Sequence, residues 1–269
     1  MIKPIQIRVT PECAAKKKFL INRISNEFNI SKNDIKDINI LKKSIDARQK
    51  QIKINLKIDV YINQKFIEHS KTRKYKNVNE SKEVIIIGAG PAGLFAALKL
   101  IENGVKPIII ERGKKVRNRR RDLAKITKEH VINDDSNYCF GEGGAGTFSD
   151  GKLYSQIKDK RHLGRKVLDE FVKACAPPEI LFLSKPHIGT FKLVTMVERM
   201  RAEIISLGGE IHFDAKVALL LHEPSTDCES NHRDALTPAE VNDNIVRQVT
   251  GVCLADGTTL NSRHIVMAM

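Results

Sequence analysis

The chain has 269 residues, of which 41% are hydrophobic and 29% charged. This balance is typical of a folded globular protein and excludes the disordered and fibrous classes. The longest uncharged run, at 84–98, is interrupted by glycines, and no apolar signal segment opens the chain, so we expect a cytoplasmic protein without a membrane partner.

The formal net charge of +14 and the basic run at 114–121 raise the question of nucleic-acid binding. Aromatic residues are only 5% of the chain and do not alternate with this run, so no base-stacking surface is indicated. We interpret the run as a solvated helix face, with the alternative that a few of its arginines meet the phosphates of a ligand. Nucleic acid is therefore not an expected partner.

The cysteines and histidines show no arrangement that favours a disulfide framework or a metal site. The five cysteines, Cys13, Cys139, Cys175, Cys228 and Cys253, lie far apart and form no Cys-x-x-Cys pair. We predict that they are buried, free thiols. Among the eight histidines there is no His-x-x-x-His pair, so no metal site is predicted.

Residues 1–62 have the pattern of a small α+β domain. Apolar and polar residues alternate up to Val9, and Thr10-Pro11 begins a helix whose apolar residues recur at helical spacing. Residues 52–62 alternate strictly, which predicts a strand with one solvated face, paired with 38–45.

Two polar segments accompany this domain. Residues 44–48, Ser-Ile-Asp-Ala-Arg, form a polar turn suited to contact a partner domain. Residues 63–82 are mostly polar and charged and are interpreted as a linker.

An apolar strand beginning at Val84 runs directly into the turn Gly-Ala-Gly-Pro-Ala-Gly, and a helical pattern follows. This order predicts a dinucleotide-binding β-α-β unit. Gly88 allows the tight turn, Gly90 lets the backbone approach a pyrophosphate, and Gly93 lets the helix pack closely on the strand. The N-terminal amides of the helix then face the phosphates.

A second strand and an acidic residue complete this unit. After the helix stop at Asn103-Gly104, residues 107–110 form an apolar strand that ends at Glu111. An acid about 20 residues beyond the first glycine is positioned to bind a ribose hydroxyl. The spacing therefore predicts that Glu111 is the ribose ligand.

A glycine-rich loop at 141–151 is the second candidate for ligand binding. Five glycines in this stretch are incompatible with a regular helix or strand. No strand precedes it and no helix pattern follows, so it is not a second dinucleotide turn. Its amides are suited to an anion-binding nest, and its glycines let the chain pass close to a flat ring; a flexible surface loop is the alternative.

The rest of the chain alternates helices and strands. We expect helices at 163–175 and 191–207, strands at 210–213 and 215–221, a polar insertion at 222–244, and a hairpin of 245–254 with 258–268. The strand at 210–213 is predicted to be the third strand of the cofactor sheet. His187, in a loop before the second helix, is either a proton donor near a bound ring or an ordinary surface histidine.

Taken together, these segments resemble the uncharacterised bacterial FAD-dependent dehydrogenases, a branch of the glutathione-reductase-like two-dinucleotide-binding flavoproteins. The resemblance is most specific at 141–152, at 185–190 and in the N-terminal domain with its 44–48 motif. It implies an α/β fold, with a Rossmann-like FAD-binding domain at 83–269 and the small α+β domain before it. It also implies non-covalent FAD, a small-molecule substrate of unknown identity, and NAD(P)H as a candidate electron donor.

The resemblance further implies roles for individual residues. The pyrophosphate would be held by Gly88, Gly90, Ala92 and Gly93, the ribose by Glu111, other phosphates by Arg112 and Arg119, and the adenine by Val217. The segment near the isoalloxazine would comprise Gly143, Gly144, Ala145, Thr147, Ser149 and Gly151. Lys152 is a candidate for stabilising charge on the reduced flavin, and His187 is a second weak catalytic candidate.

In this family the final hairpin leads into a Thr-Gly segment and a further half-protein, whereas this sequence stops at Met269. We therefore expect an N-terminal fragment with an incomplete FAD-binding domain, so the activity of this form is an open question. An FAD-dependent oxidoreductase is the first hypothesis. A flavoprotein of RNA modification and a non-catalytic remnant are the alternatives, and an NAD-binding protein is disfavoured because the glycine loop would have no role in it.

Overall fold

The computed structural model describes residues 1–67, 75–153, 157–161, 163–224 and 247–269. Its contacts divide the chain into two compact units, Met1–Thr72 with Asp150–Lys192 and Arg73–Ser149 with Leu193–Met269. The segment Asp150–Lys192 thus groups with the N-terminal residues, whereas the sequence interpretation placed all of 83–269 in one domain.

The N-terminal part of the first unit is an antiparallel sheet in the order β1-β3-β2. Its strands are β1 (Ile2–Val9), β2 (Ile35–Asp46) and β3 (Lys53–Ile62). The central strand pairs with both neighbours, which confirms the predicted pairing of 38–45 with 52–62. Strict alternation in β1 and β3 sends every second side chain to one face of the sheet.

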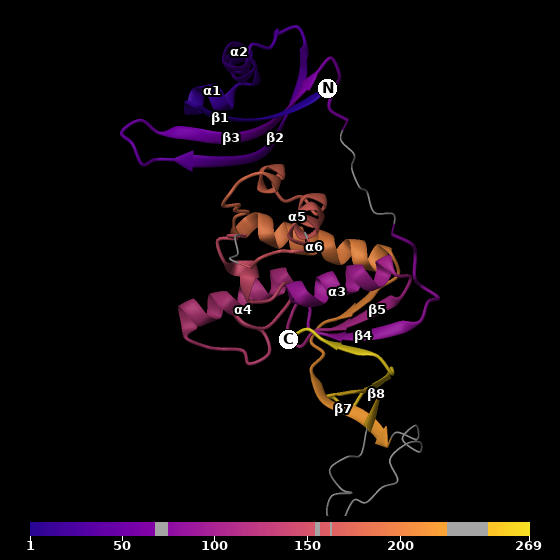
Figure 1. Ribbon diagram of the computed structural model, residues 1–269. Coiled ribbons are helices and arrows are strands. Elements are labelled where there is room, and N and C mark those ends of the chain that lie inside the picture. Colours follow the sequence, from indigo (N-terminus) through magenta and orange to yellow (C-terminus); the bar gives the residue numbers. More distant parts are fainter. Residues whose placement is uncertain (68–74, 154–156, 162, 225–246) are drawn as a thin grey trace, which may run out of the picture. The chain divides into compact units, whose positions relative to one another are not determined.

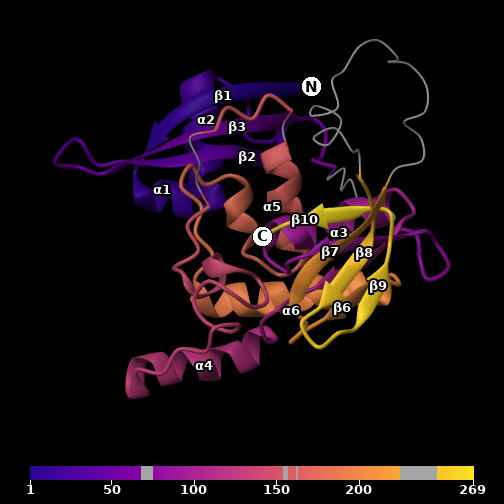
Figure 2. The same cartoon turned by 90° about the horizontal axis from the view of Figure 1, so that it is seen from below.

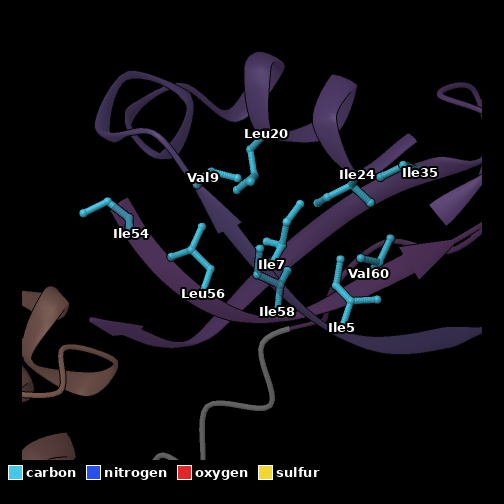
Figure 3. Packing of buried hydrophobic residues seen from close by; sticks show 10 residues of the cluster. All are labelled: Ile5, Ile7, Val9, Leu20, Ile24, Ile35, Ile54, Leu56, Ile58 and Val60. Atoms are coloured by element: carbon cyan, nitrogen blue, oxygen red, sulfur yellow. The ribbon is translucent and has the colours of Figure 1, made fainter. Parts of the chain in front are cut away.

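Two short helices cover that face. Helix α1 (Pro11–Ala15) begins where the Thr10 hydroxyl accepts a hydrogen bond from the N–H of Cys13, and α2 (Lys17–Phe28) follows it. Figure 3 shows the apolar side chains that pack between the sheet and the helical layer: Ile5, Ile7, Val9, Leu20, Ile24, Ile35, Ile54, Leu56, Ile58 and Val60. Their burial leaves the opposite face of the sheet to polar side chains.

The later segment of the first unit contains α5 (Leu163–Lys173) and a 3-10 turn, η2 (Pro178–Leu181). After this turn the chain runs beside the edge of β2. There the N–H of Lys43 donates to the carbonyl of Phe182 at 2.8 Å, and the N–H of Ser184 donates to the carbonyl of Lys43 at 3.0 Å. These backbone hydrogen bonds join 150–192 to the N-terminal sheet.

A parallel sheet in the order β10-β4-β5-β6 organises the second unit. Its strands are β4 (Glu83–Ile87), β5 (Lys106–Ile110), β6 (Glu210–His212) and β10 (Ile265–Met267). The helices of this unit are α3 (Pro91–Glu102), α4 (Val116–Glu129) and α6 (Thr190–Ser206). The parallel pairing of β6 with β5 confirms the predicted third strand of the sheet.

A second, antiparallel sheet covers the other side of the parallel sheet, opposite α3 and α6 (Figures 1 and 2). It consists of β7 (Val217–Pro224), β8 (Arg247–Leu254) and β9 (Thr259–Asn261) in that order. Its inner residues Val252 and Leu254 pack against the isoleucines of β4 and β5.

The C-terminal hairpin differs from the sequence prediction, which made 258–268 a single strand. In the structure β9 ends at Asn261, and the chain then crosses to the parallel sheet, where β10 pairs with β4. Three polar residues, 262–264, separate the two strands, and nothing in their pattern shows that the chain changes sheet there. This crossing brings 267–269 beside the turn after β4.

Several predicted segments fall partly outside the described residues. Residues 225–246, which include most of the polar insertion and Cys228, and 68–74 of the linker lie outside them. The end of the linker is well packed, because Val78 is buried and its N–H donates to the carbonyl of Leu207 at 2.8 Å. No helix in the described part of the chain is long and apolar enough to cross a membrane.

The described cysteines correct one expectation. No disulfide joins Cys13, Cys139, Cys175 or Cys253, but Cys139 and Cys175 are exposed rather than buried, and Cys13 and Cys253 are half-buried. Cys139 lies in an irregular segment, and Cys175, expected at the end of a helix, lies in the turn after α5, which ends at Lys173.

Candidate functional site

The three glycines of the turn after β4 lie in different surroundings. Gly88 has a φ of +106°, and a Cβ there would lie 2.8 Å from the carbonyl oxygen of Ala268. A Cβ on Gly93 would collide with the carbonyl oxygen of Gly88. Gly90 is different, because its Cβ would meet nothing nearer than the Cα of Gly144, at 3.9 Å. The protein itself therefore leaves room for a side chain at Gly90.

Helix α3 begins directly after this turn, with Gly90 as its N-cap and Pro91 as its first residue. The N–H of Leu94 donates to the carbonyl of Gly90 at 3.0 Å. Within the described residues, no acceptor pairs with the N–H of Ala92 or of Gly93. These free amides, with the helix dipole, favour an anion at this end of α3.

Glu111 stands at the carboxyl end of β5 and is buried, with 5% of its surface exposed. Its carboxylate accepts hydrogen bonds from three amides, those of Ala89 at 2.8 Å, Gly113 at 2.8 Å and Gly141 at 3.1 Å. The side chain thus joins the first glycine turn to the glycine-rich loop. The predicted acid Glu111 therefore lies between the glycine turn after β4 and the glycine-rich loop at 141–151.

A cavity of about 580 Å³ opens at the carboxyl ends of β4 and β5. Ligands of open α/β sheets bind at this edge. Of the sequence-predicted residues, the structure brings Gly88, Gly90, Ala92, Glu111, Arg112, Gly144, Ala145 and Val217 to its wall. Its remaining wall comes from Ile87, Pro91 and Ile110, from 139–141, from 215–220 and from 267–269.

Other predicted residues of the second unit do not line this cavity. They are Gly93, Arg119, Gly143, Thr147 and Ser149. Gly93 lies just behind the wall, one residue after Ala92. The N–H of Gly143 donates to the carbonyl of Ala89 at 2.8 Å, which holds the glycine-rich loop against the first turn.

Arg119 does not line the cavity and lies in the interior of the second unit. Its side chain is fully buried in the α4 layer. The guanidinium donates to the backbone carbonyls of Asn137, Tyr138, Gly141, Glu142 and Gly144 at 2.8 to 3.3 Å. These acceptors engage Nε and both Nη atoms, so in this structure Arg119 contacts the glycine-rich loop, and its contact with phosphate stays a prediction.

Glu142 is a residue of this loop that the sequence interpretation missed. Its side chain is 1% exposed, and Oε2 accepts a hydrogen bond from the N–H of Val116 at 2.7 Å. Arg201 of α6 donates to both carboxylate oxygens, at 2.8 and 2.6 Å. The signal available in the sequence was a single acid among glycines, and its partner is 59 positions away.

Charged and aromatic groups meet at the outer wall of the cavity. The Arg112 guanidinium lies over the Phe140 ring, 4.2 Å from its centroid, and its Nε donates to Asp135 at 2.8 Å. Lys216 also approaches Asp135, at 3.3 Å. The hydrogen bond from Arg112 is the main cause that lowers the pKa of Asp135.

The two catalytic candidates, Lys152 and His187, are neighbours in the first unit. An isolated antiparallel bridge pairs them, between the hydrogen bonds Leu153 N–H to Pro186 carbonyl, 2.9 Å, and Ile188 N–H to Gly151 carbonyl, 3.0 Å. Lys152 Nζ also forms an exposed ion pair with Asp150 at 2.9 Å. The structure therefore joins the two sequence motifs, 141–152 and 185–190, in one short ribbon.

Comparison with known proteins gives two family matches. Residues 1–61 match a domain of unknown function, and residues 81–130 match the family described as FAD binding domain. A relative from Clostridium beijerinckii (strain ATCC 51743 / NCIMB 8052), an uncharacterized protein, is 41% identical over 220 residues, which are 76% of this chain. The match spans 41% of that relative's length.

Similar solved structures include THI4 of Thermovibrio ammonificans, at 15% identity and a TM-score of 0.40, covering 71% of this chain and 58% of that one. Another is 3-ketosteroid-delta4-(5alpha)-dehydrogenase of Rhodococcus jostii RHA1, at 12% identity and a TM-score of 0.36, covering 74% and 47%. The family match at 81–130 coincides with β4, α3, β5 and α4. This α/β chain thus has a Rossmann-like second unit in which residues 81–130 match the FAD binding domain family, with a small α+β domain before it.

Proposed function

We propose that the second unit binds FAD and that the chain is part of an FAD-dependent oxidoreductase. The observation that carries the proposal is the cavity at the carboxyl ends of β4 and β5, bordered by Gly90 and by Ala92, whose N–H has no acceptor among the described residues. The match of 81–130 to FAD binding domains supports the same ligand. FAD, when bound, supplies the redox chemistry, and the protein supplies binding and orientation.

The residues of the cavity suit the ADP part of FAD. The pyrophosphate would lie against Gly88, Gly90 and the amides of Ala92 and Gly93, where the helix dipole favours negative charge. Glu111 uses its carboxylate oxygens for three amides and keeps acceptor capacity for a ribose hydroxyl. We assign the adenine to the side of the cavity at Val217.

Arg112 would act on the ligand from the rim. Its stacking on Phe140 and its pairing with Asp135 hold the guanidinium at the cavity wall. From there it would compensate phosphate charge, with Lys216 as a second cation on the same wall.

The glycine-rich loop would pass near the flavin ring through Gly144 and Ala145, which line the cavity. The backbone conformation of that segment would be maintained by Gly143, Thr147, Ser149 and Gly151. The roles of Lys152 in stabilising flavin charge and of His187 in proton donation stay predictions. Because the two residues share a ribbon, they should be substituted both singly and together.

The test uses the room around Gly90. A Cβ at this position meets no protein atom closer than 3.9 Å, so Gly90→Ala is expected to fold normally. The methyl group would occupy the path of the pyrophosphate, so FAD affinity should fall by about tenfold or more. Gly146→Ala is the matched control, because a Cβ there meets nothing within 4 Å and the residue does not line the cavity.

The measurement is calorimetric titration of each chain with FAD and, in parallel, with NAD, together with the yellow flavin absorption of the purified protein. Preferential binding of FAD that is weakened in Gly90→Ala and kept in Gly146→Ala is the expected result. Tighter binding of NAD, or equal FAD affinity in the two variants, would contradict the proposal.

We also propose NAD(P)H as the electron donor. Anaerobic mixing of the FAD-loaded chain with NADH or NADPH should bleach the flavin absorption. Persistence of the absorption with both donors would remove this part of the proposal and leave FAD binding untouched.

A further inference from the structure

A second concave surface lies on the small N-terminal domain, on the face of its sheet opposite the helices. Polar side chains of all three strands form its rim: Gln6, Arg8, Lys42, Ser44, Asn55 and Lys57. The residues Ile7 and Leu56 complete the lining, and the volume is about 580 Å³. We call this surface the sheet groove. A volume of this size is within the range of small-molecule sites.

Strand register arranges the polar groups in two rows across the sheet. Lys57 of the central strand lies between Gln6 and Lys42, and Asn55 lies between Arg8 and Ser44. Directly opposed residues of antiparallel strands have neighbouring side chains. The groove therefore presents three cations next to two amides and a hydroxyl.

The opposition of Lys42 and Lys57 is unfavourable for the sheet itself. Like charges directly opposite each other destabilise an antiparallel pair. The register of β2 shifts between Ile40 and Lys42, and this irregularity sets Lys42 opposite Lys57. No carboxylate among the described residues is paired with either lysine.

Two acids lie near the groove on this face of the sheet. Asp59 lies two residues from Lys57 along β3, and among the described residues no ion pair joins it to Lys57 or Lys42. Asp46 accepts two hydrogen bonds from the Arg48 guanidinium, both at 2.8 Å, and forms an ion pair with Arg8 at 3.1 Å. It therefore does not neutralise the two lysines. The lining of the groove contains no acidic residue and no aromatic residue.

We propose that the sheet groove binds a small molecule that carries phosphate groups. Lys42 and Lys57 would share the phosphate oxygens, Arg8 would give a directed contact, and Gln6, Asn55 and Ser44 would orient the rest of the ligand. An anion between the two lysines removes the repulsion that the register imposes. A nucleic-acid single strand is disfavoured because the groove has no aromatic side chain for base stacking.

The test is titration of the full chain with inorganic pyrophosphate, followed by the NMR signals of individual amides. Saturable shifts of the Gln6 and Asn55 side-chain amides are expected. Pyrophosphate should also bind at the N-terminus of α3, and the signals of Gly90 and Ala92 report that site separately. The two sites can thus succeed or fail independently.

Lys57→Glu is the decisive variant. It converts the like-charge pair with Lys42 into an opposite-charge pair, so the urea midpoint of the domain should rise while the groove loses pyrophosphate binding. Lys57→Gln should weaken binding by roughly two- to fivefold, as expected for one solvated ion pair. Lys18→Glu, which makes the same charge change on the exposed face of α2, is the matched control.

The proposal is supported if the pyrophosphate-induced NMR shifts of Gln6 and Asn55 are lost in Lys57→Glu but kept in Lys18→Glu. Lys57→Glu should also be more stable than the parent in urea. Absence of saturable shifts at Gln6 and Asn55, or equal weakening in both variants, overturns it. A single-stranded RNA oligonucleotide that binds the groove in preference to pyrophosphate would overturn the small-molecule assignment in favour of nucleic acid.

Discussion

Arg119 Nη1 donates a hydrogen bond to the carbonyl of Gly144 at 2.8 Å, so a buried residue of α4 fixes a glycine of the cavity wall. The same guanidinium holds four other carbonyls of the segment 137–142. A loop rich in glycine has a large conformational entropy to lose. Because one buried side chain binds several carbonyls of the loop, the loop is held in one conformation beside the cavity.

The first prediction is that Arg119→Met destabilises the second unit by about 3 kcal/mol or more, since several buried carbonyls lose their donors. Urea unfolding followed by circular dichroism measures the loss. The exposed Arg121 on the same helix is the control, and Arg121→Met should stay within about 0.5 kcal/mol of the parent. Equal stability of the two variants would show that Arg119 does not hold the loop.

The second prediction concerns the buried pair of Glu142 and Arg201. Arg201→Met alone leaves the Glu142 carboxylate buried with only the Val116 N–H, and we expect a loss of about 3 kcal/mol. Glu142→Gln alone leaves the Arg201 cation without its carboxylate. The double variant removes both charges, so its loss should be smaller than the sum by about 1 kcal/mol or more. Additive losses in urea unfolding would exclude an energetic coupling of the pair.

Much of the candidate site could be predicted because its parts lie close together in the sequence. Strand, turn, helix, strand and the acid Glu111 follow one another within 30 residues, and each is recognised from its own short pattern. The small N-terminal sheet was predictable for the same reason, because alternation in 52–62 reports one buried face.

Contacts between distant segments were not predictable in this way. Arg119 stands in a run of basic residues, and nothing in the run shows which of them is buried. The hydrogen bonds of Arg201 with Glu142 join segments 59 positions apart. The segment 150–192 groups with the first unit and is joined to it by backbone hydrogen bonds of Lys43, which the side-chain pattern does not report.

The third prediction separates the structural glycine from the ligand-contacting glycine. An alanine in a helix is normally more stable than glycine by about 1 kcal/mol. At Gly93 the sign should reverse, because the Cβ would collide with the carbonyl oxygen of Gly88, and we expect a loss of roughly 2 kcal/mol. Urea unfolding of Gly93→Ala without added FAD tests this, and an increase in stability would show that the turn adapts without strain.

The fourth prediction is a pH dependence that originates at Asp46. The hydrogen bonds from Arg48 are the main cause that lowers the pKa of Asp46 below its ordinary value of 3.8. Because the folded-state pKa is depressed, the stabilisation is present above about pH 4 and is lost as the pH falls toward the folded-state pKa. Asp46→Asn should remove this part of the acid sensitivity of the N-terminal domain.

Unfolding of the parent and of Asp46→Asn by urea, at a series of pH values from neutral to acid, measures the effect. The parent should be the more stable at neutral pH, and the two curves should converge as Asp46 takes up its proton. Asp34→Asn in the same domain is the control, because no hydrogen bond of its side chain holds the fold among the described residues, and it should follow the parent at every pH. A constant difference between parent and Asp46→Asn across the series would mean that the Arg48 contact contributes through geometry rather than through the charge of the carboxylate.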